Sequence, residues 1–169
     1  MTDFFKTLKR RHSTRSFTSQ NVPKSKLTKI LNGVKLAPSS AGLQSYKIFI
    51  IKKDVIKKKL VLATHGQKYV DSQVVFVFCM NPAKIKQKFG SRGEKLFSLQ
   101  DATIAAAYTQ LCAEALGISS VWIGHFNEKL VKRALRTKLR PVCIMPLGYS
   151  NEKPKGRKSK KLSEIVRIL

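Results

Sequence analysis

The stretch LQDATIAAAYTQLCAEAL, residues 99–116, decides the fold of this chain. Alanine, leucine, isoleucine and tyrosine occupy most of the circumference of a helix drawn through it, and its few charges are those of Asp101 and Glu114. A helix that is apolar on nearly every side is buried. The stretch therefore predicts a central helix around which the rest of the chain packs, and Gly117 is well placed to cap its C-terminus.

The segments on both sides of this helix alternate between helical and extended patterns. Dense β-formers predict strands at 46–52 (YKIFIIK) and 142–147. The run VVFVFC at 74–79 lacks polar alternation, which predicts a strand covered on both faces. Apolar residues at helical spacing predict further helices over residues 3–11, 25–36, 54–63 and 127–138.

Three other segments are less regular. The basic stretch 84–93 is expected to form a mobile connection or a short helix, and ISSVWIG at 118–124 an irregular apolar segment. The ending LSEIVRIL at 162–169 is expected to dock as an amphipathic element, on a second subunit. With 169 residues, 43% of them hydrophobic, the chain is expected to form one domain over residues 1–169 with a substantial core.

The charge is the most unusual feature of the composition. Thirty-four lysines and arginines against nine acidic residues give a formal net charge of +25. Such an excess predicts an anionic partner: nucleic acid, a phosphorylated cofactor or an anionic membrane surface. A lysine-rich background that serves no binding is also compatible with it, and composition does not choose among these interpretations.

Several classes of protein are disfavoured by what the sequence lacks. The three cysteines lie far apart among apolar neighbours, which is typical of core residues, and without a CxxC pair or a histidine cluster we expect no metal site. No GxGxxG, GxxxxGK or GxSxG motif occurs. No secretory h-region and no run of ~18 apolar residues is present, so we expect a soluble, cytoplasmic protein without a membrane partner.

The segment RRHSTRSF at 10–17 concentrates three arginines, a histidine and hydroxyl groups. Guanidinium groups offer a planar fork of donors that suits phosphate oxygens, and hydroxyls add hydrogen bonds without further charge. The segment follows the predicted first helix, however, and cations are favoured at a helix C-terminus without any ligand. Both interpretations stay open for this segment taken alone.

Four segments occur in a definite order: RRHSTRSF at 10–17, APSSAGLQS at 37–45, QDATIAAAYTQLCAEALGISSVWIGHF at 100–126 and PLGYSNEKPKGRKSKKLSEIV at 146–166. Together they resemble the nitroreductase family of flavin mononucleotide (FMN) enzymes. The resemblance implies an α+β fold, a three-layer sandwich with a mostly antiparallel central sheet flanked by helices. It also implies an interlocked homodimer that buries two FMN molecules at its interface.

The resemblance further implies an FMN-dependent oxidoreductase. Hydride would pass from NADH or NADPH through the bound flavin to a small electron-poor acceptor, a nitroaromatic or a quinone. The flavin carries this chemistry, so no catalytic side chain is expected.

The family's cofactor-binding residues map onto four groups of positions here. Its N-terminal motif, which contacts the flavin phosphate, ribityl chain and pyrimidine edge, falls on Arg11, His12, Ser13 and Arg15. Its C-terminal phosphate contacts fall on Arg157, Lys158 and Lys160. The loop that the other subunit places against the ring falls on Pro38, Ser39, Ser40, Gly42 and Gln44. The backbone beside flavin N5 falls on Ile123, Gly124 and His125.

The loop departs from the family pattern at two positions. Gly42 stands where the family usually has asparagine, and Ser45 where proline usually follows the glutamine. The lost amide removes one hydrogen-bonding group near the flavin, so affinity or pocket shape is expected to differ. At the N5 edge, His125 also has a second interpretation as an ordinary surface histidine.

Two alternative functions remain open. A nucleic-acid-binding protein could use the basic helix 129–138 and the tail 153–161 to follow phosphates. It is the less favoured interpretation, because no nucleic-acid-binding module is visible and basic residues are spread throughout the chain. The other alternative is a flavin-binding relative with a different reaction, since fold does not fix function.

Overall fold

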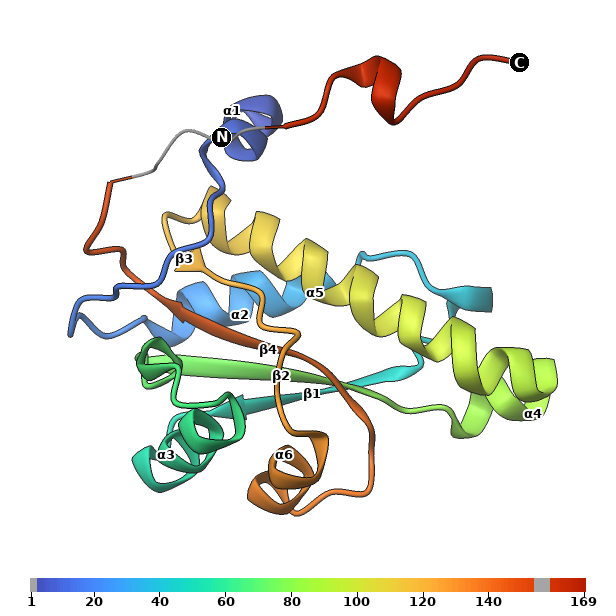
Figure 1. The fold of residues 1–169 in the computed structure, drawn as a ribbon, viewed down its shortest axis with the longest axis horizontal. Helices are drawn as coiled ribbons and strands as arrows, with labels where there is room; N and C mark the ends of the chain where they lie inside the picture. The colour runs from blue at the N-terminus through green and yellow to red at the C-terminus, as the bar shows by residue number, and fades with distance from the viewer. Residues whose placement is uncertain (1–2, 154–158) are drawn as a thin grey trace.

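The computed structural model, which describes residues 3–153 and 159–169, shows an antiparallel sheet between two layers of helices (Figure 1). The strands lie in the order β1-β2-β4-β3. Their bounds are Tyr46–Ile51 for β1, Val74–Met80 for β2, Ser119–Ser120 for β3 and Pro141–Gly148 for β4. The predicted α+β class, with a central antiparallel sheet, is confirmed.

Strand β2 explains why the sequence between residues 74 and 79 has no polar alternation. Val74, Phe76 and Phe78 belong to the core under α2 (Lys24–Val34) and α5 (Ser98–Ala115). The alternate residues, among them Val75 and Val77, belong to the core under α3 (Asp54–Ala63) and α6 (Glu128–Leu135). Every residue of the strand is buried, as expected for a strand covered on both faces.

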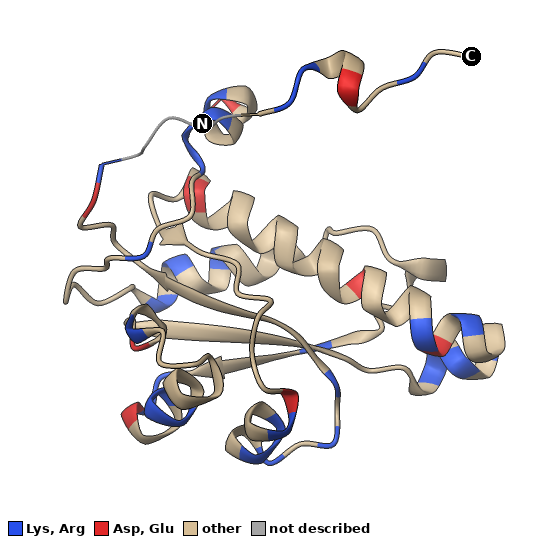
Figure 2. Cartoon of the chain, in the orientation of Figure 1, with Lys and Arg blue, Asp and Glu red and all other residues tan. Residues whose placement is uncertain are grey.

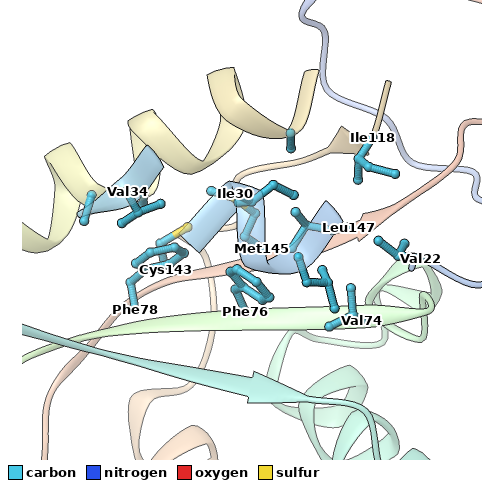
Figure 3. Packing of buried hydrophobic residues seen from close by; sticks show 14 residues of the cluster. Val22, Ile30, Val34, Val74, Phe76, Phe78, Ile118, Cys143, Met145 and Leu147 are labelled. Atoms are coloured by element: carbon cyan, nitrogen blue, oxygen red, sulfur yellow. The ribbon is translucent and has the colours of Figure 1, made fainter. Parts of the chain in front are cut away.

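The larger of the two cores lies between the sheet and the helices α2 and α5. Figure 3 shows Ile30 and Val34 of α2 above Phe76, Phe78 and Met145 of the sheet. Ala105, Ala106 and Ala113 of α5 belong to the same cluster, and their small side chains let α5 lie close to α2 and the sheet. The predicted buried central helix is confirmed, and Gly117 ends it with φ +71°.

Two helical segments depart from the expectation by more than one or two residues at an end or in their character. The segment expected as a mobile connection or a short helix is the helix α4, Ala83–Arg92, which runs through a π-helical turn, Gly93–Phe97, directly into α5. Helix α6 ends at Leu135 instead of 138, because Arg136 adopts a left-handed conformation (φ 52°, ψ 47°) and Thr137 N donates to Lys132 O. That geometry usually uses glycine, so an arginine at this position does not indicate a helix end.

Both ends of the chain lie on one side of the molecule. Helix α1, Phe4–Arg10, is capped by Asp3, whose Oδ1 accepts from Phe5 N at 2.9 Å. Residues 162–169, expected to dock as an amphipathic element, form a 3₁₀ turn at Leu162–Glu164, and their apolar side chains are exposed. Figure 1 shows this segment projecting past α1, away from the sheet.

The remaining short elements are the 3₁₀ turns η1, Ser40–Gly42, and η2, Lys68–Val70. Cys79 and Cys143 are buried and Cys112 is half-buried, as expected of core cysteines. Across residues 3–153 and 159–169, no helix is long and apolar enough to cross a membrane.

The contact between α2 and α5 depends on Gly33. A Cβ atom at this position would lie 2.4 Å from Cys112 Sγ, well inside van der Waals contact. We therefore expect Gly33→Ala to lower the free energy of unfolding by about 1–3 kcal/mol through overpacking, although alanine is the better helix former. Urea unfolding measures this change.

The control is the double variant Gly33→Ala/Cys112→Ala, which removes the sulfur atom. It should be at least as stable as Cys112→Ala alone, because the clash is gone and the helix propensity of alanine remains. A Gly33→Ala single variant as stable as the parent chain would show that the helices tolerate a wider separation.

Candidate functional site

The basic segment at the N-terminus lies extended along the β3 edge of the sheet. Ser13 forms a parallel bridge with Ser120, and Thr14 N donates to Ser120 O at 3.2 Å. Farther along, Thr18 N donates to Tyr149 O at 2.9 Å. Backbone pairing therefore holds this segment against β3 and the end of β4.

Two carboxylates hold the basic segment at its ends, and the side chains of Arg11 and Arg15 stay free to bind an anion. Arg10 Nε donates to Glu114 Oε1 of α5 at 3.2 Å, and the backbone N–H of Arg15 donates to Glu152 Oε1 at 2.7 Å. Among the described residues, no carboxylate pairs with the side chains of Arg11 or Arg15. Both guanidinium groups can therefore meet an external anion.

His12 and Ser13 lie between these arginines and are half-buried. The His12 ring bonds on both sides, with Nδ1 at 3.1 Å from Arg10 O and Nε2 at 3.1 Å from Thr14 Oγ1. The imidazole thus stiffens the turn between helix α1 and the extended segment.

The segment 123–125 lies at the same edge of the sheet. Ile123 exchanges two backbone hydrogen bonds with Ile144, at 2.9 and 3.1 Å, so neither of its backbone groups is left for a ligand. Gly124 is exposed, and a Cβ atom there would contact only the Trp122 ring. In the part of the chain that the structure describes, the amides of Gly124 and His125 have no acceptor.

His125 is exposed and stacks on His65 of the loop after α3, with ring centroids 4.5 Å apart and an interplanar angle of 26°. His65 adopts a positive φ of 57°. The pair therefore borders the open surface at Gly124.

The loop 38–45 is held by one buried carboxylate at the start of α5. Asp101 is 1% exposed and accepts from Ser40 N at 2.9 Å, from Ser45 N at 3.1 Å and from the Ser45 hydroxyl. Proline at position 45 would have neither donor. The departure from the family pattern at this position thus supplies two hydrogen bonds to Asp101.

Hydrogen bonds made by its own side chains also stabilise the loop 38–45. Gln44 N donates to Ser39 Oγ at 3.0 Å, and Gln44 Nε2 donates to Lys35 O at 3.1 Å. Gly42 has φ +68° and an unoccupied space where a Cβ would point. Because asparagine is the non-glycine residue that best tolerates such a φ, glycine here keeps the backbone conformation that asparagine allows.

A hollow of about 550 Å³ opens between this loop and α5. Its walls are mostly apolar, and the carboxylate of Asp101, one of the lining residues, is already bonded to the loop. The lining residues are Pro38, Ser39, Ser40, Leu99, Gln100, Asp101, Thr103 and Ile104.

Helix α5 separates the two halves of the site that the sequence predicts. Glu114 near its end holds Arg10 beside segments 11–15 and 123–125, whereas Asp101 near its start holds the loop 38–45. The two acidic residues are about 20 Å apart at a rise of about 1.5 Å per residue. A single chain therefore brings together two of the predicted groups and keeps the loop apart from them.

The basic residues of the tail complete the list. Lys160 is exposed, and Arg157 and Lys158 lie outside the described residues. The tail leaves the sheet at Asn151, whose N–H donates to Ser16 O at 3.0 Å, so it starts beside the N-terminal segment.

Three acidic residues position the site but were not predicted to do so: Asp101, Glu114 and Glu152. The sequence pattern could have indicated Asp101 and Glu114, since they are the only charged residues on a helix that is otherwise mostly apolar. The negative charge of Asp101 is also felt by Tyr46, where burial and then this charge raise the pKa of the phenol. Within the described ranges, no three metal-ligating side chains cluster.

The role of Asp101 is testable by its removal. Asp101→Ala leaves the N–H groups of Ser40 and Ser45 without their acceptor, so we expect a loss of about 2–4 kcal/mol in the free energy of unfolding. Limited proteolysis should then cut the loop 38–45 faster. Gln100→Ala, an exposed neighbour on the same helix, is the matched control and should change neither quantity. Equal stability of the two variants would contradict this role.

Comparison with known proteins supports the same architecture. "Nitroreductase A" from Vibrio parahaemolyticus superposes with a TM-score of 0.90 at 25% identity, covering 99% of this chain and 76% of that one. A "nitroreductase family protein" from Clostridium difficile gives a TM-score of 0.87 at 26% identity, covering 99% and 98%.

Curated relatives agree with these structures. A "Putative NADH dehydrogenase/NAD(P)H nitroreductase" from Archaeoglobus fulgidus is 27% identical and covers 90% of this chain and 88% of its own length. An "FMN reductase [NAD(P)H]" from Bacillus subtilis is 32% identical and covers 73% and 55%. The model of the Nitroreductase family matches residues 8–71 and 62–149. The chain therefore belongs to the nitroreductase family.

Proposed function

We propose that the chain is an FMN-dependent oxidoreductase that takes hydride from NADH or NADPH and passes it to a small electron-poor acceptor, a nitroaromatic or a quinone. One observation carries the proposal. The guanidinium groups of Arg11 and Arg15, which have no carboxylate partner among the described residues, lie on the same edge of the sheet as the exposed backbone at Gly124. Relatives named for FMN and for NAD(P)H support the cofactor and the donor.

The residues present fit FMN. Its phosphate carries about two negative charges, and charge-assisted hydrogen bonds from Arg11 and the hydroxyl of Ser13 are what such a group needs. The exposed glycine at position 124 lets a flat ring approach the backbone closely. Lys160, with Arg157 and Lys158, would add further positive charge from the tail.

Bound FMN would supply the two-electron redox chemistry. The chain itself would bind the cofactor and provide hydrogen-bond donors and positive charge around it. The amides of Gly124 and His125 are placed to donate hydrogen bonds to the ring edge where electron density arrives, which stabilises the reduced form without an acid or base residue. Because both backbone groups of Ile123 are bonded to Ile144, that residue fixes the position of these amides and does not itself donate.

The site requires a second copy of the chain. Pro38, Ser39, Ser40, Gly42 and Gln44 lie about 20 Å along α5 from the N-terminal segment, so the loop of one chain would cover the ring held by the other. Exposed apolar side chains that a second chain could cover lie near both ends of the chain. Phe5 is 68% exposed, and Ile165, Val166, Ile168 and Leu169 of the tail are exposed too. We therefore propose a homodimer with FMN at its interface.

The purified chain is expected to be yellow, to release FMN on denaturation, and to oxidise NADH or NADPH when menadione or a nitroaromatic is present. Absorbance of the nicotinamide measures turnover. A yellow protein without turnover by either donor would favour a flavin-binding relative with a different reaction. A colourless protein that gains no thermal stability from FMN would contradict the whole proposal.

Arg11→Ala tests the phosphate contact. Loss of a charge-assisted hydrogen bond is expected to raise the Kd for FMN about 10- to 100-fold, measured by quenching of flavin fluorescence. Lys9→Ala removes the same charge from an exposed position two residues earlier and is the matched control. If both variants weaken FMN equally, the arginine acts only through net charge.

Phe5→Ser/Leu8→Ser tests the shared site. Both side chains lie exposed on α1, so the variant should fold, but it is expected to sediment as a monomer and to lose FMN at the same time. Val55→Ser/Leu62→Ser changes two exposed apolar residues of α3 and should leave the dimer intact. Monomers that keep FMN with unchanged affinity would show that one chain forms the whole site.

A further inference from the structure

The positive charge of the surface is not balanced by the acidic residues of the chain. All nine acidic side chains accept hydrogen bonds or ion pairs from within the chain: Asp3, Asp54, Asp71, Glu94, Asp101, Glu114, Glu128, Glu152 and Glu164. Among the described lysines and arginines, only Arg10, Lys57, Lys86 and Arg140 form ion pairs with side-chain carboxylates, so most of the described cations have no carboxylate partner.

Part of this charge lies on the outer layer formed by α3 and α6, whose basic residues are far apart in the sequence. Figure 2 shows basic residues on both helices, which pack side by side against the same face of the sheet. We name the outward surface of these two helices the α3–α6 face. It comprises Val55, Lys58, Lys59, Leu62, Lys129 and Arg133, of which all are exposed.

The acidic residues of this layer do not offset the face. Asp54 and Asp71 both pair with Lys57, at 2.9 and 3.4 Å, and Glu128 pairs with Arg140 at 3.1 Å. Asp54 and Asp71 share one lysine, so this cluster leaves one net negative charge beside the four cations of the face, Lys58, Lys59, Lys129 and Arg133.

The centre of the outward side of α3 is apolar. Val55 and Leu62 are two turns apart on one side of the helix and are 67% and 72% exposed. Lys58 and Lys59 lie between them in sequence and flank them on the helix surface. Apolar side chains framed by lysines are typical of helices that lie in a membrane interface, where the apolar groups enter below charged headgroups.

The face also lies away from the proposed dimer contacts. Helix α1 and residues 162–169 are on the opposite side of the molecule, beyond α2 and α5 (Figure 1). A second copy that joins through α1 and the tail would leave the α3–α6 face open in both copies.

We propose that the α3–α6 face docks on the surface of an anionic lipid bilayer. Its lysines and Arg133 meet headgroup phosphates and carboxylates, and Val55 and Leu62 insert at the acyl boundary. A nucleic-acid backbone also attracts the cations but offers no place for these two apolar side chains. The absence of a spanning segment predicted no membrane partner, but surface docking does not require one.

Cosedimentation of the full chain, loaded with FMN, with phosphatidylcholine/phosphatidylserine vesicles at physiological ionic strength tests the proposal. Lys58→Gln/Lys59→Gln/Lys129→Gln is expected to lower the partition coefficient about 100-fold, since each lysine near such a surface contributes roughly five-fold. The matched control is Lys24→Gln/Lys29→Gln/Lys35→Gln, which removes three exposed lysines at α2 and should have a much smaller effect.

Val55→Ser/Leu62→Ser separates a bilayer from a nucleic acid. It should weaken vesicle binding at least ten-fold and leave binding to a DNA duplex unchanged, with the same melting temperature and FMN content as the parent chain. Three results would overturn the proposal: no binding of the parent chain to anionic vesicles, equal losses in the two lysine triples, or vesicle binding that is indifferent to Val55 and Leu62.

Discussion

Burial of helix α5 is the constraint on which the rest of the structure depends. Its alanine-rich surface lies against the sheet and against α2, where Gly33 has no room for a Cβ beside Cys112. A helix so enclosed can carry polar side chains only where these find hydrogen-bond partners. Both of its acidic residues have such partners. Glu114 holds Arg10 and Asp101 holds Ser40 and Ser45, so the buried helix sets the separation between the two halves of the proposed FMN site.

Much of this fold could be predicted from local pattern, because the pattern reports burial directly. The bounds of α3 were predicted residue for residue, and the apolar run of β2 indicated a strand covered on both faces. The left-handed turn at Arg136 and the approach of Gly33 to Cys112 have no local signature, since the one uses a residue that rarely adopts such a φ and the other depends on a distant helix.

The site was predictable only in part, for a related reason. The arginine-rich segment and the stretch 123–125 were recognised by motif, and the structure places both along one sheet edge. The carboxylates that position these segments were not recognised. Asp101, for example, accepts hydrogen bonds from residues more than fifty positions away in the sequence. Likewise, the basic residues of α3 and α6 are distant in sequence and form one face only when both helices cover the sheet.

Each proposed FMN site is built by two chains, and a heterodimer of two defective chains tests this sharing most directly. One chain carries Arg11→Ala; the other carries Gly42→Asp, which adds a negative charge to the loop in open space. Each homodimer alone should bind FMN at least about ten-fold more weakly than the parent dimer. A shared site predicts one FMN per purified heterodimer, bound with the parent affinity, because one site then receives both intact halves. Heterodimers in which neither site reaches the parent affinity, with both homodimers folded, would contradict a site shared between two chains.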